Sequence, residues 1–344
     1  MTDPSTYMRA EIDEAGAAIA RQLAANAERV AALGRKLKAL DPPVLTTIAR
    51  GSSDHCALYL KYLAEIVLGV PCASIGPSIA TLYDAPLRLS GAVAVAISQS
   101  GRSPDLIEMQ RSALKAGATT IAMVNEVDSP LATEAEALLP LAAGREQSVA
   151  ATKSMIAGMV AGAALVAAWR GDAALAAAVA GLPALLPAQS APPPEAMIER
   201  LTRVEHAFVL GRGATFAVAA EAALKLKETC AIHAEAYSSA EVLHGPAELA
   251  RPGFLVIAFM PTDAGRDGMV MTLRLLAAAG ADVVRVDSGG EDAADRLACA
   301  AAASPLLTPI VMIHRYYGLA EAVSRRLGRN PDRPRNPHKV TETL

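Results

Sequence analysis

The chain has 344 residues, of which 52% are hydrophobic and 19% charged, and its formal net charge is −3. This length accommodates two domains with separate cores, and the near-neutral charge argues against non-specific nucleic-acid binding, which needs a basic surface. Residues 1–14 are polar and lack the apolar core of a secretory signal. The most apolar run, residues 155–169, is shorter than the roughly 20 residues that span a bilayer, which favours a buried helix. We therefore expect a cytoplasmic protein with no nucleic-acid or membrane partner.

The cysteines predict neither a disulfide framework nor a metal centre. Cys56, Cys72, Cys230 and Cys299 form no CxxC pair, and their spacing does not fit a zinc site. The Asp, Glu and His residues do not cluster at metal-ligand spacing either. We expect reduced thiols and no metal or other cofactor.

The first half of the chain alternates strands and helices. Residues 1–35 carry apolar side chains at helical spacing before Gly34, and predict an N-terminal helix. The predicted elements that follow are a strand at 44–49, a helix ending at Leu68, a strand at 92–97, a helix at 104–116 and a strand at 120–124. Strands that are apolar throughout and alternate with helices indicate a parallel sheet covered on both faces.

The same order then recurs in the second half. Predicted strands occupy 208–210, 255–260 and 282–286, with a long helix after the first and a helix to Ala279 after the second. The intervening residues 182–194 contain five prolines and are typical of a linker. The predicted parts are a helical segment 1–35, a first α/β domain 36–181, a linker 182–198, a second α/β domain 199–330 and a tail 331–344.

A candidate phosphate loop follows the second strand of the first half. It reads Ser98–Gln99–Ser100–Gly101–Arg102–Ser103, and ligands of parallel sheets bind at the carboxyl ends of the strands, near helix N-termini. Its N–H groups and the hydroxyls of Ser98, Ser100 and Ser103 can point at one phosphate dianion. The alternative is a loop that merely caps a helix, since serine and glycine are common there. Arg102 either adds positive charge or is solvated.

The second half lacks such a loop and carries acid–base side chains instead. Its equivalent loop keeps one hydroxyl, at Thr262, and gains Asp263, which makes it poorer for a dianion. Lys225 and Glu228 lie one helical turn apart, and His244 precedes Gly–Pro on a loop. A pair at this spacing is commonly a solvated ion pair, and a lone histidine is commonly structural. A phosphate anchor in one half and acid–base groups in the other favour an enzyme that acts on a small phosphorylated substrate.

These residues also resemble a known family, the sugar-isomerase (SIS) proteins, and in particular the isomerase half of glucosamine-6-phosphate synthase. The similarity covers nearly the whole chain. The motifs that carry it are Gly51–Ser53, the SQSG loop Ser98–Gly101, Ala151–Lys153, the ALKLKE run ending at Glu228, HAEAY at His233–Tyr237, and His244–Pro246. The resemblance implies two tandem flavodoxin-like SIS domains and a homodimer.

The resemblance also assigns roles to individual positions. It implies a base that moves a proton between C1 and C2 at Glu228, assisted by Lys225, and a ring-opening histidine at His244 that reaches the pocket of the partner subunit. The tail places a sugar-facing lysine at Lys339 and a histidine, His338, where the synthase has a small residue. The implied substrate-binding positions, from the phosphate cradle to the sugar lining, are Ser98, Gln99, Ser100, Ser103, Ser53 and Val149.

One departure decides which relatives this chain resembles more. The synthase has an N-terminal glutaminase domain whose nucleophile is a cysteine at its mature amino terminus, whereas Thr2 follows Met1 here and the first cysteine is Cys56. We therefore expect no glutamine hydrolysis from these residues. The chain looks more like the shorter SIS-type glucosamine-6-phosphate deaminases.

The expected activity is deamination of an amino sugar 6-phosphate to fructose 6-phosphate and ammonia. Three alternatives stay open: a deglycase acting on fructosamine 6-phosphates, ammonia-dependent synthesis of glucosamine 6-phosphate, and, from another class, a sugar-phosphate sensor. A sensor predicts a DNA-binding extension and loss of the acid–base set. The sequence leaves the gluco or galacto configuration of the sugar open.

Overall fold

The computed structural model describes residues 6–290 and 293–334, and the chain forms two compact units. The first-sheet unit comprises residues 17–145 and 153–180. The second-sheet unit comprises residues 6–16, 146–152 and, within the described part, 181–334. Each unit is therefore built from segments that are not continuous in the sequence.

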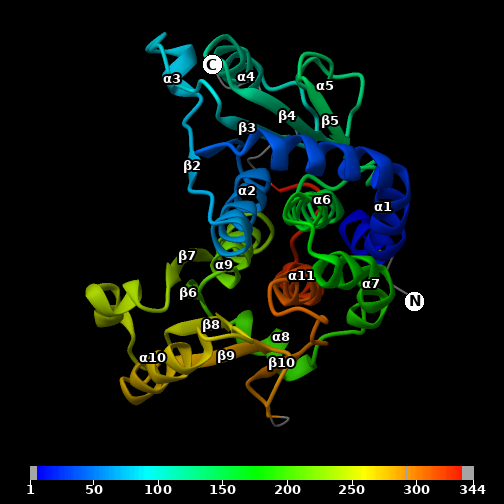
Figure 1. The fold of residues 1–344 in the computed structure, drawn as a ribbon. Helices are drawn as coiled ribbons and strands as arrows, with labels where there is room; N and C mark the ends of the chain where they lie inside the picture. Colours follow the sequence, from blue (N-terminus) through cyan, green and yellow to red (C-terminus); the bar gives the residue numbers. More distant parts are fainter. Residues whose placement is uncertain (1–5, 291–292, 335–344) are drawn as a thin grey trace. The chain divides into compact units, whose positions relative to one another are not determined.

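The first-sheet unit contains a five-stranded parallel sheet in the order β2-β1-β3-β4-β5. Its strands are β1 (Leu45–Ile48), β2 (Cys72–Ser74), β3 (Val93–Ser98), β4 (Thr119–Val124) and β5 (Ala137–Pro140). Its helices are α2 (Ser52–Leu63), continued by a π-helix (Ala64–Leu68), α3 (Ser78–Thr81), α4 (Pro104–Lys115), α5 (Pro130–Thr133) and α6 (Lys153–Arg170). Figure 1 shows α4 and α5 on one side of this sheet and α2 and α6 on the other. Every residue of β1 and β3 is buried, as expected for strands covered on both faces.

The second-sheet unit repeats this topology in the order β10-β9-β8-β6-β7, again with every pairing parallel. Its strands are β6 (His206–Gly211), β7 (His233–Ser238), β8 (Leu255–Phe259), β9 (Asp282–Asp287) and β10 (Arg296–Ala298). Its helices include α8 (Glu195–Leu201), α9 (Thr215–Lys225) with a π-helix (Leu226–Cys230), α10 (Arg266–Ala278) and α11 (Thr308–Arg326), and two 3-10 turns (Glu241–His244 and Pro246–Leu249). Figure 1 shows α9 and α11 on one face of the sheet and α10 on the other. Counted in chain order, both sheets have the arrangement 2-1-3-4-5, which is the flavodoxin-like order. The predicted pair of tandem flavodoxin-like α/β domains is confirmed.

The N-terminal helix is longer than predicted. Helix α1 (Tyr7–Leu40) continues past Gly34, at which the sequence predicted its end. A Cβ at this glycine would lie 2.7 Å from the carbonyl carbon of Ala168 in α6, within the same unit. Gly34 is therefore an interior helical residue that permits close backbone packing, and not a helix terminator.

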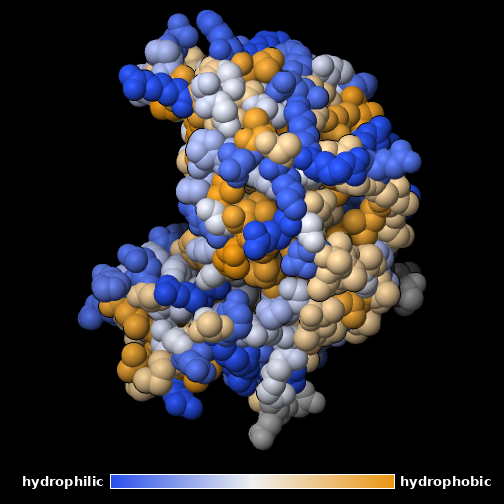
Figure 2. Space-filling view, viewed as in Figure 1, coloured by the Kyte–Doolittle hydropathy of each residue, from blue (hydrophilic) through white to orange (hydrophobic). Residues whose placement is uncertain are grey.

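The predicted linker is largely helical. Helix α7 (Ala173–Gln189) contains Pro183 and Pro187, and α8 begins soon afterwards. A proline inside a helix removes a hydrogen bond and commonly costs about 3 kcal/mol. Here a Cβ at Gly16 of α1 would lie 3.2 Å from the Pro187 ring, so the proline packs against a helix that makes room for it. Alanines form most of the outward face of α7, which Figure 2 shows as a tan, moderately hydrophobic area.

Helix α6 is buried along most of its length, as the apolar run predicted. No helix within the described residues is long and apolar enough to cross a membrane.

A buried histidine makes the second-sheet unit sensitive to acid. The Nε2 atom of His314 in α11 donates to the carbonyl of Ile12 at 2.8 Å, and Nδ1 has no hydrogen-bond partner among the described residues. Burial lowers the pKa of His314 to about 4, although the Ile12 carbonyl opposes this shift. Because the unfolded chain takes up this proton near pH 6.5, stability falls as the pH drops from about 6.5 to about 4.

We therefore expect His314→Gln to flatten the acid side of the stability profile. The glutamine amide can still donate to the Ile12 carbonyl, but it does not titrate. In the wild type this one group lowers the free energy of unfolding by up to about 1.4 kcal/mol per pH unit within that window. Urea denaturation at several pH values measures the slope, and equal slopes for the two proteins would contradict the assignment.

Candidate functional site

The loop after β3 has the geometry of an anion site. In an open parallel sheet, ligands bind at the carboxyl ends of the two adjacent strands at which the strand order reverses. In this sheet those strands are β1 and β3. Ser98 ends β3, Ser103 precedes α4, and both are buried. Gly101 between them has φ +63°, a conformation that favours glycine. The predicted loop residues thus lie together at the expected edge of the sheet.

Hydrogen bonds hold this loop in shape. The Ser98 hydroxyl oxygen accepts from the Gly101 N–H at 3.0 Å, and the Gly101 carbonyl accepts from the Leu131 N–H at 3.2 Å. The carbonyl of Gln99 accepts from the Glu126 N–H at 3.3 Å. The Ser98 hydroxyl keeps its own O–H free to donate, so the preformed loop can give hydrogen bonds to a phosphate.

Two arginines lie at this loop, and only one of them was considered from the sequence. Arg102 forms an exposed ion pair with Asp128 at 3.2 Å, which agrees with the solvated alternative. Arg50 follows β1, and its Nε lies 3.2 Å from Oδ2 of the buried Asp105 in the first turn of α4. Its side chain is 50% exposed, so the remaining guanidinium N–H groups are available to an anion. Arg50 could have been found from the sequence, because it directly precedes Gly51 in the loop that follows β1. Ser53, in the first turn of α2, lies on the same β1 side.

Changing Gly101 to alanine tests the loop. A Cβ at this position would lie 2.7 Å from the Ser129 Cβ, in addition to the cost of φ +63°. We expect affinity for inorganic phosphate to fall about tenfold or more, because the loop N–H groups must move. Gly91→Ala is the matched control, since Gly91 has φ +75° but open space around its Cβ position. Isothermal titration with phosphate measures both, and equal affinities for the two variants would place the anion elsewhere.

The second-sheet unit holds the predicted acid–base pair in a buried position. Lys225 is the last residue of α9, and Glu228 lies in the π-helix that continues it. The Lys225 Nζ lies 2.5 Å from the Glu228 Oε2, with the lysine side chain fully buried and that of the glutamate 24% exposed. The structure therefore rules out a solvated ion pair. A lysine enclosed in protein, beside a carboxylate that still reaches solvent, is a candidate acid–base pair and not a surface contact.

Two further side chains complete this cluster and were missed in the sequence. Glu221 lies 3.4 Å from the Lys225 Nζ, and the Tyr317 hydroxyl of α11 donates to Glu221 at 3.0 Å. Glu221 could have been found from the sequence, because it lies one turn before Lys225 on the same helix. Tyr317 could not, since only the fold brings α11 to α9. We call Glu221, Lys225, Glu228 and Tyr317 the acid–base cluster.

The electrostatics of the cluster keep Lys225 charged. Burial alone would lower the pKa of Lys225, but the carboxylates of Glu221 and Glu228 outweigh it and raise the pKa above its ordinary value. Burial raises the pKa of Tyr317 well above its ordinary value, and the carboxylates of Glu221, Glu146 and Glu228 add to this. The cluster therefore presents an ammonium group and a neutral phenol beside the carboxylates of Glu221 and Glu228.

Comparison of the two halves shows that the first half has no glutamate at the position that corresponds to Glu228. Both α2 and α9 continue into a π-helix that is followed by a left-handed residue, Gly69 in one half and Ala231 in the other. The third residue before the left-handed position is Ile66 in the first half and Glu228 in the second. Short π-helices often occur at functional sites. The first half has the backbone feature without the chemistry.

Val149 lies on residues 146–152, a segment of the second-sheet unit that adjoins the cluster. The pKa of Tyr317 responds to Glu146, which begins this segment. Glu146 in turn accepts from the Thr152 N–H at 3.0 Å, and Val149 is half-buried.

His244 ends a 3-10 turn after β7 and is exposed. No described contact joins it to Lys225 or Glu228. The predicted positions His338 and Lys339 lie outside the described residues.

The loop of the second half that corresponds to the phosphate loop is closed by its own carboxylate. Asp263 accepts from the Gly265 N–H at 2.9 Å, and its carbonyl accepts from the Arg266 N–H at 3.0 Å. Two of the N–H groups that an anion could use at this loop are thus already engaged by Asp263. This observation supports the interpretation of a half that has lost phosphate binding.

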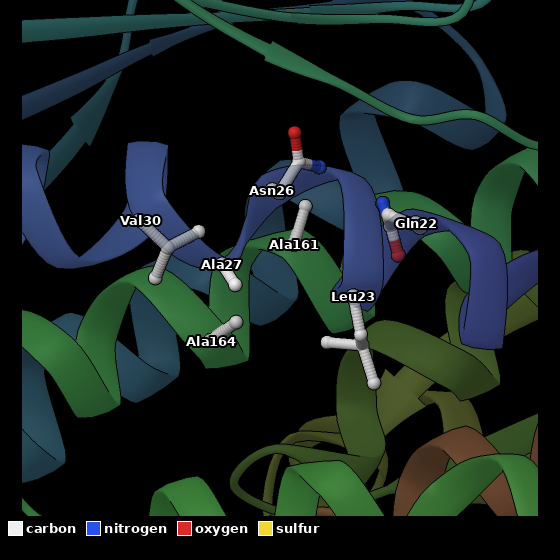
Figure 3. A pocket seen from close by; sticks show the side chains of 7 residues that line it. All are labelled: Gln22, Leu23, Asn26, Ala27, Val30, Ala161 and Ala164. Carbon is white, nitrogen blue, oxygen red and sulfur yellow. The ribbon is translucent and has the colours of Figure 1, made fainter.

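A small cavity in the first-sheet unit does not suit a sugar phosphate. It measures about 70 Å³ and lies between α1 and α6, as Figure 3 shows. Ligand pockets commonly measure roughly 300–1,000 Å³. Its walls are apolar, and the amides of Gln22 and Asn26 donate to main-chain carbonyls of Ala157 and Pro140. Within residues 6–290 and 293–334, no group of three or more His, Cys, Asp or Glu side chains could hold a metal ion.

Comparison with known proteins identifies the family. Residues 43–168 and 200–311 match the model of the SIS domain family. The isomerizing glutamine–fructose-6-phosphate aminotransferase of a Thermus thermophilus strain is 32% identical over 316 residues, which cover 87% of this chain and 52% of that protein. The chain thus spans about half the length of the curated relatives it matches.

Solved structures share the whole fold. A provisionally described phosphosugar isomerase from Silicibacter pomeroyi DSS-3 is 42% identical, with a TM-score of 0.90 over 95% of this chain and 100% of that one. The C-terminal domain of glucosamine-fructose-6-phosphate aminotransferase from Francisella tularensis is 27% identical, with a TM-score of 0.84 over 96% and 99% of the two chains. A glucosamine-6-phosphate deaminase from Thermotoga maritima, 21% identical with a TM-score of 0.78 over 98% and 100%, shares the fold. With both halves matched by the family model, this chain belongs to the SIS-domain family.

Proposed function

We propose that the chain is an isomerising deaminase that converts glucosamine 6-phosphate into fructose 6-phosphate and ammonia. The observation that carries this proposal is the buried Lys225 held between Glu221 and Glu228 in the second half. A protein that only binds sugar phosphates has no need for a buried ammonium group between two carboxylates, because such groups are costly to desolvate. The names of the similar isomerising aminotransferases and the phosphosugar isomerase support the substrate class.

In the proposed mechanism the substrate phosphate binds at Ser98, Gln99, Ser100 and Ser103, with Arg50 adding positive charge. Its fixed position orients the open-chain sugar, whose C1 is an aldehyde and whose C2 carries the amino group. Ser53 and Val149 line the sugar.

Glu228 removes the C2 proton of the bound sugar, and the electron pair of that C–H bond forms an enolamine between C1 and C2. Lys225 stabilises the negative charge that develops on O1. Glu228 then returns a proton to C1, O1 takes up a proton from solvent, and the C2 nitrogen releases a proton to solvent. These transfers leave a hydroxyl at C1 and an imine at C2. Water adds to the imine carbon, and loss of ammonia yields the ketone of fructose 6-phosphate.

His244 is the proposed ring-opening residue. Its ring moves a proton from the C1 hydroxyl to the ring oxygen, and a homodimer would supply it to the partner subunit's substrate. The exposed position of His244 on a turn after β7 supports such a role, because an exposed ring is accessible to a second subunit. Lys339 is the proposed second lysine at the sugar, with His338 beside it.

The alternatives differ in the bond that is made or broken at nitrogen. A deglycase would use the same phosphate anchor and base on fructosamine 6-phosphates. Ammonia-dependent synthesis is the reverse of the proposed reaction. A sensor would keep the phosphate loop but would gain nothing from the acid–base cluster, so the buried Lys225 argues against it.

A substrate panel separates these functions. The purified chain is supplied in turn with glucosamine 6-phosphate, galactosamine 6-phosphate, a fructosamine 6-phosphate, and fructose 6-phosphate plus ammonia. Fastest turnover of glucosamine 6-phosphate is the expected result, and fastest turnover of the fructosamine would assign a deglycase. Binding of all sugar phosphates without turnover would identify a sensor and overturn the proposal.

A further inference from the structure

Asp332 joins the C-terminal part of the second-sheet unit to the start of α1. One oxygen of its carboxylate accepts from the Tyr7 N–H and the other from the Met8 N–H, each at 2.8 Å. Its relative exposure is 9%. Thr6 already caps the same helix, because its hydroxyl oxygen accepts from the Arg9 N–H at 3.0 Å. Asp332 therefore does more than end a helix: it fixes residue 332 itself against α1.

The same helix holds the Val149 segment through a second carboxylate. Glu11, one turn after Met8 and 5% exposed, accepts from the Gln147 N–H and, at 3.4 Å, from the Ser148 N–H. The next N–H along the chain, that of Val149, donates to the main-chain carbonyl of Asp332 at 3.3 Å. Three consecutive N–H groups are thus held by residues from the two ends of the described chain.

These contacts form a closed ring. Helix α1 carries Glu11, Glu11 binds residues 147–148, Val149 binds the Asp332 carbonyl, and the Asp332 carboxylate binds the first N–H groups of α1. We call Glu11 and Asp332 the carboxylate brace. A hydrogen bond to a carboxylate is among the stronger polar contacts. Losing it would leave a buried acceptor unsatisfied, which costs free energy.

We propose that the carboxylate brace positions the main chain at Val149 for the sugar. This inference rests on the proposed function, in which Val149 lines the substrate. Glu11 and Asp332 touch neither substrate nor reacting atoms, so they act as positioning residues. They make α1 part of the framework of the site, although the sequence suggested a separate N-terminal segment.

The test compares affinity for a hexitol 6-phosphate with affinity for inorganic phosphate, because only the former contacts the sugar lining. Glu11→Ala and Asp332→Ala are expected to weaken hexitol 6-phosphate binding about tenfold or more while phosphate affinity stays at the wild-type value. Glu11→Gln, which keeps an oxygen acceptor, is expected to retain affinity within about threefold. Asp172→Ala is the matched control, since Asp172 caps α7 by accepting from the Leu175 N–H at 2.8 Å. Its ratio of the two affinities should equal that of the wild type.

An unchanged ratio in folded Glu11→Ala and Asp332→Ala proteins would overturn the proposal. If these variants do not fold, amide hydrogen exchange in the wild-type protein tests the carboxylate brace instead. The amides of Gln147, Ser148 and Val149 should exchange slowly, and rapid exchange would overturn the brace. Neither readout needs turnover. Absence of ammonia release from glucosamine 6-phosphate would therefore count against the proposed function alone.

Discussion

Replacing Glu228 by glutamine is expected to lower kcat for glucosamine 6-phosphate by about 10²–10⁴-fold. The amide cannot accept the C2 proton, yet it has nearly the same shape and still accepts a hydrogen bond from Lys225, whose Nζ lies 2.5 Å from the wild-type carboxylate. Affinity for inorganic phosphate should not change, because the proposed anchor lies on another loop. Steady-state kinetics and phosphate titration give the two readouts. A variant that retained more than about a tenth of the wild-type kcat would show that Glu228 is not the base.

The duplicated fold supplies a matched control for this variant. Glu65 lies in the π-helix of the first half and pairs with Lys61 at 3.3 Å, and both side chains are more than one-third exposed. Glu65→Gln therefore makes the same chemical change in the same kind of helix, away from the acid–base cluster. Its kcat should remain close to that of the wild type. A comparable loss in both variants would indicate damage to the fold and not to catalysis.

Of the substitutions proposed here, Lys225→Met should lower the free energy of unfolding the most. The substitution leaves the fully buried Glu221 without its ammonium partner, and breaking one side of a buried ion pair commonly costs about 3–5 kcal/mol. Adding Glu221→Gln should recover part of this loss, because the uncompensated buried charge is removed. Urea denaturation of the single and double variants measures the free energy of unfolding.

The control for this second prediction is Lys61→Met. Lys61 belongs to an exposed pair, which is expected to contribute less than about 1 kcal/mol. Equal destabilisation by Lys225→Met and Lys61→Met would contradict the buried position of Lys225. Activity should also be lost in Lys225→Met, even where the protein stays folded at low temperature.

The sequence was enough to predict the repeated α/β pattern, because in both halves apolar strands alternate with helices. The strands β3, β6 and β8 are apolar over most of their length, and β1 is flanked by apolar residues. Each of the four ends in a loop with glycine or hydroxyl residues. The edge strands escaped prediction for a physical reason. Strand β7 pairs only with β6, and half of its residues in His233–Ser238 are polar, so no continuous apolar run marks it. Strands β2 and β10 have only three residues each.

The helices were mispredicted where packing overrides local preference. Gly34 and Pro187 are helix breakers in isolation, but each lies inside a helix that packs against a neighbour. Neither exception can be seen without the partner helix. Similarly, Lys225 and Glu228 were identified by spacing and resemblance, whereas their burial and the contact with Tyr317 depend on α11, which follows much later in the chain.

The two halves have diverged in chemistry while keeping the same backbone plan. The first half keeps an open loop of serines at the end of β3, and the corresponding loop of the second half is filled by Asp263. The second half keeps Glu228 where the first has Ile66. In the proposed function, the first half binds the phosphate and the second half supplies the base. The proposed deaminase function uses this difference between the two halves.

The most direct test measures ammonia and fructose 6-phosphate together after the wild-type chain is incubated with glucosamine 6-phosphate. The proposed mechanism predicts that both products appear in equal amounts and at equal rates, because imine hydrolysis releases one of each per turnover. Release of neither product by a protein that still binds phosphate would contradict the deaminase.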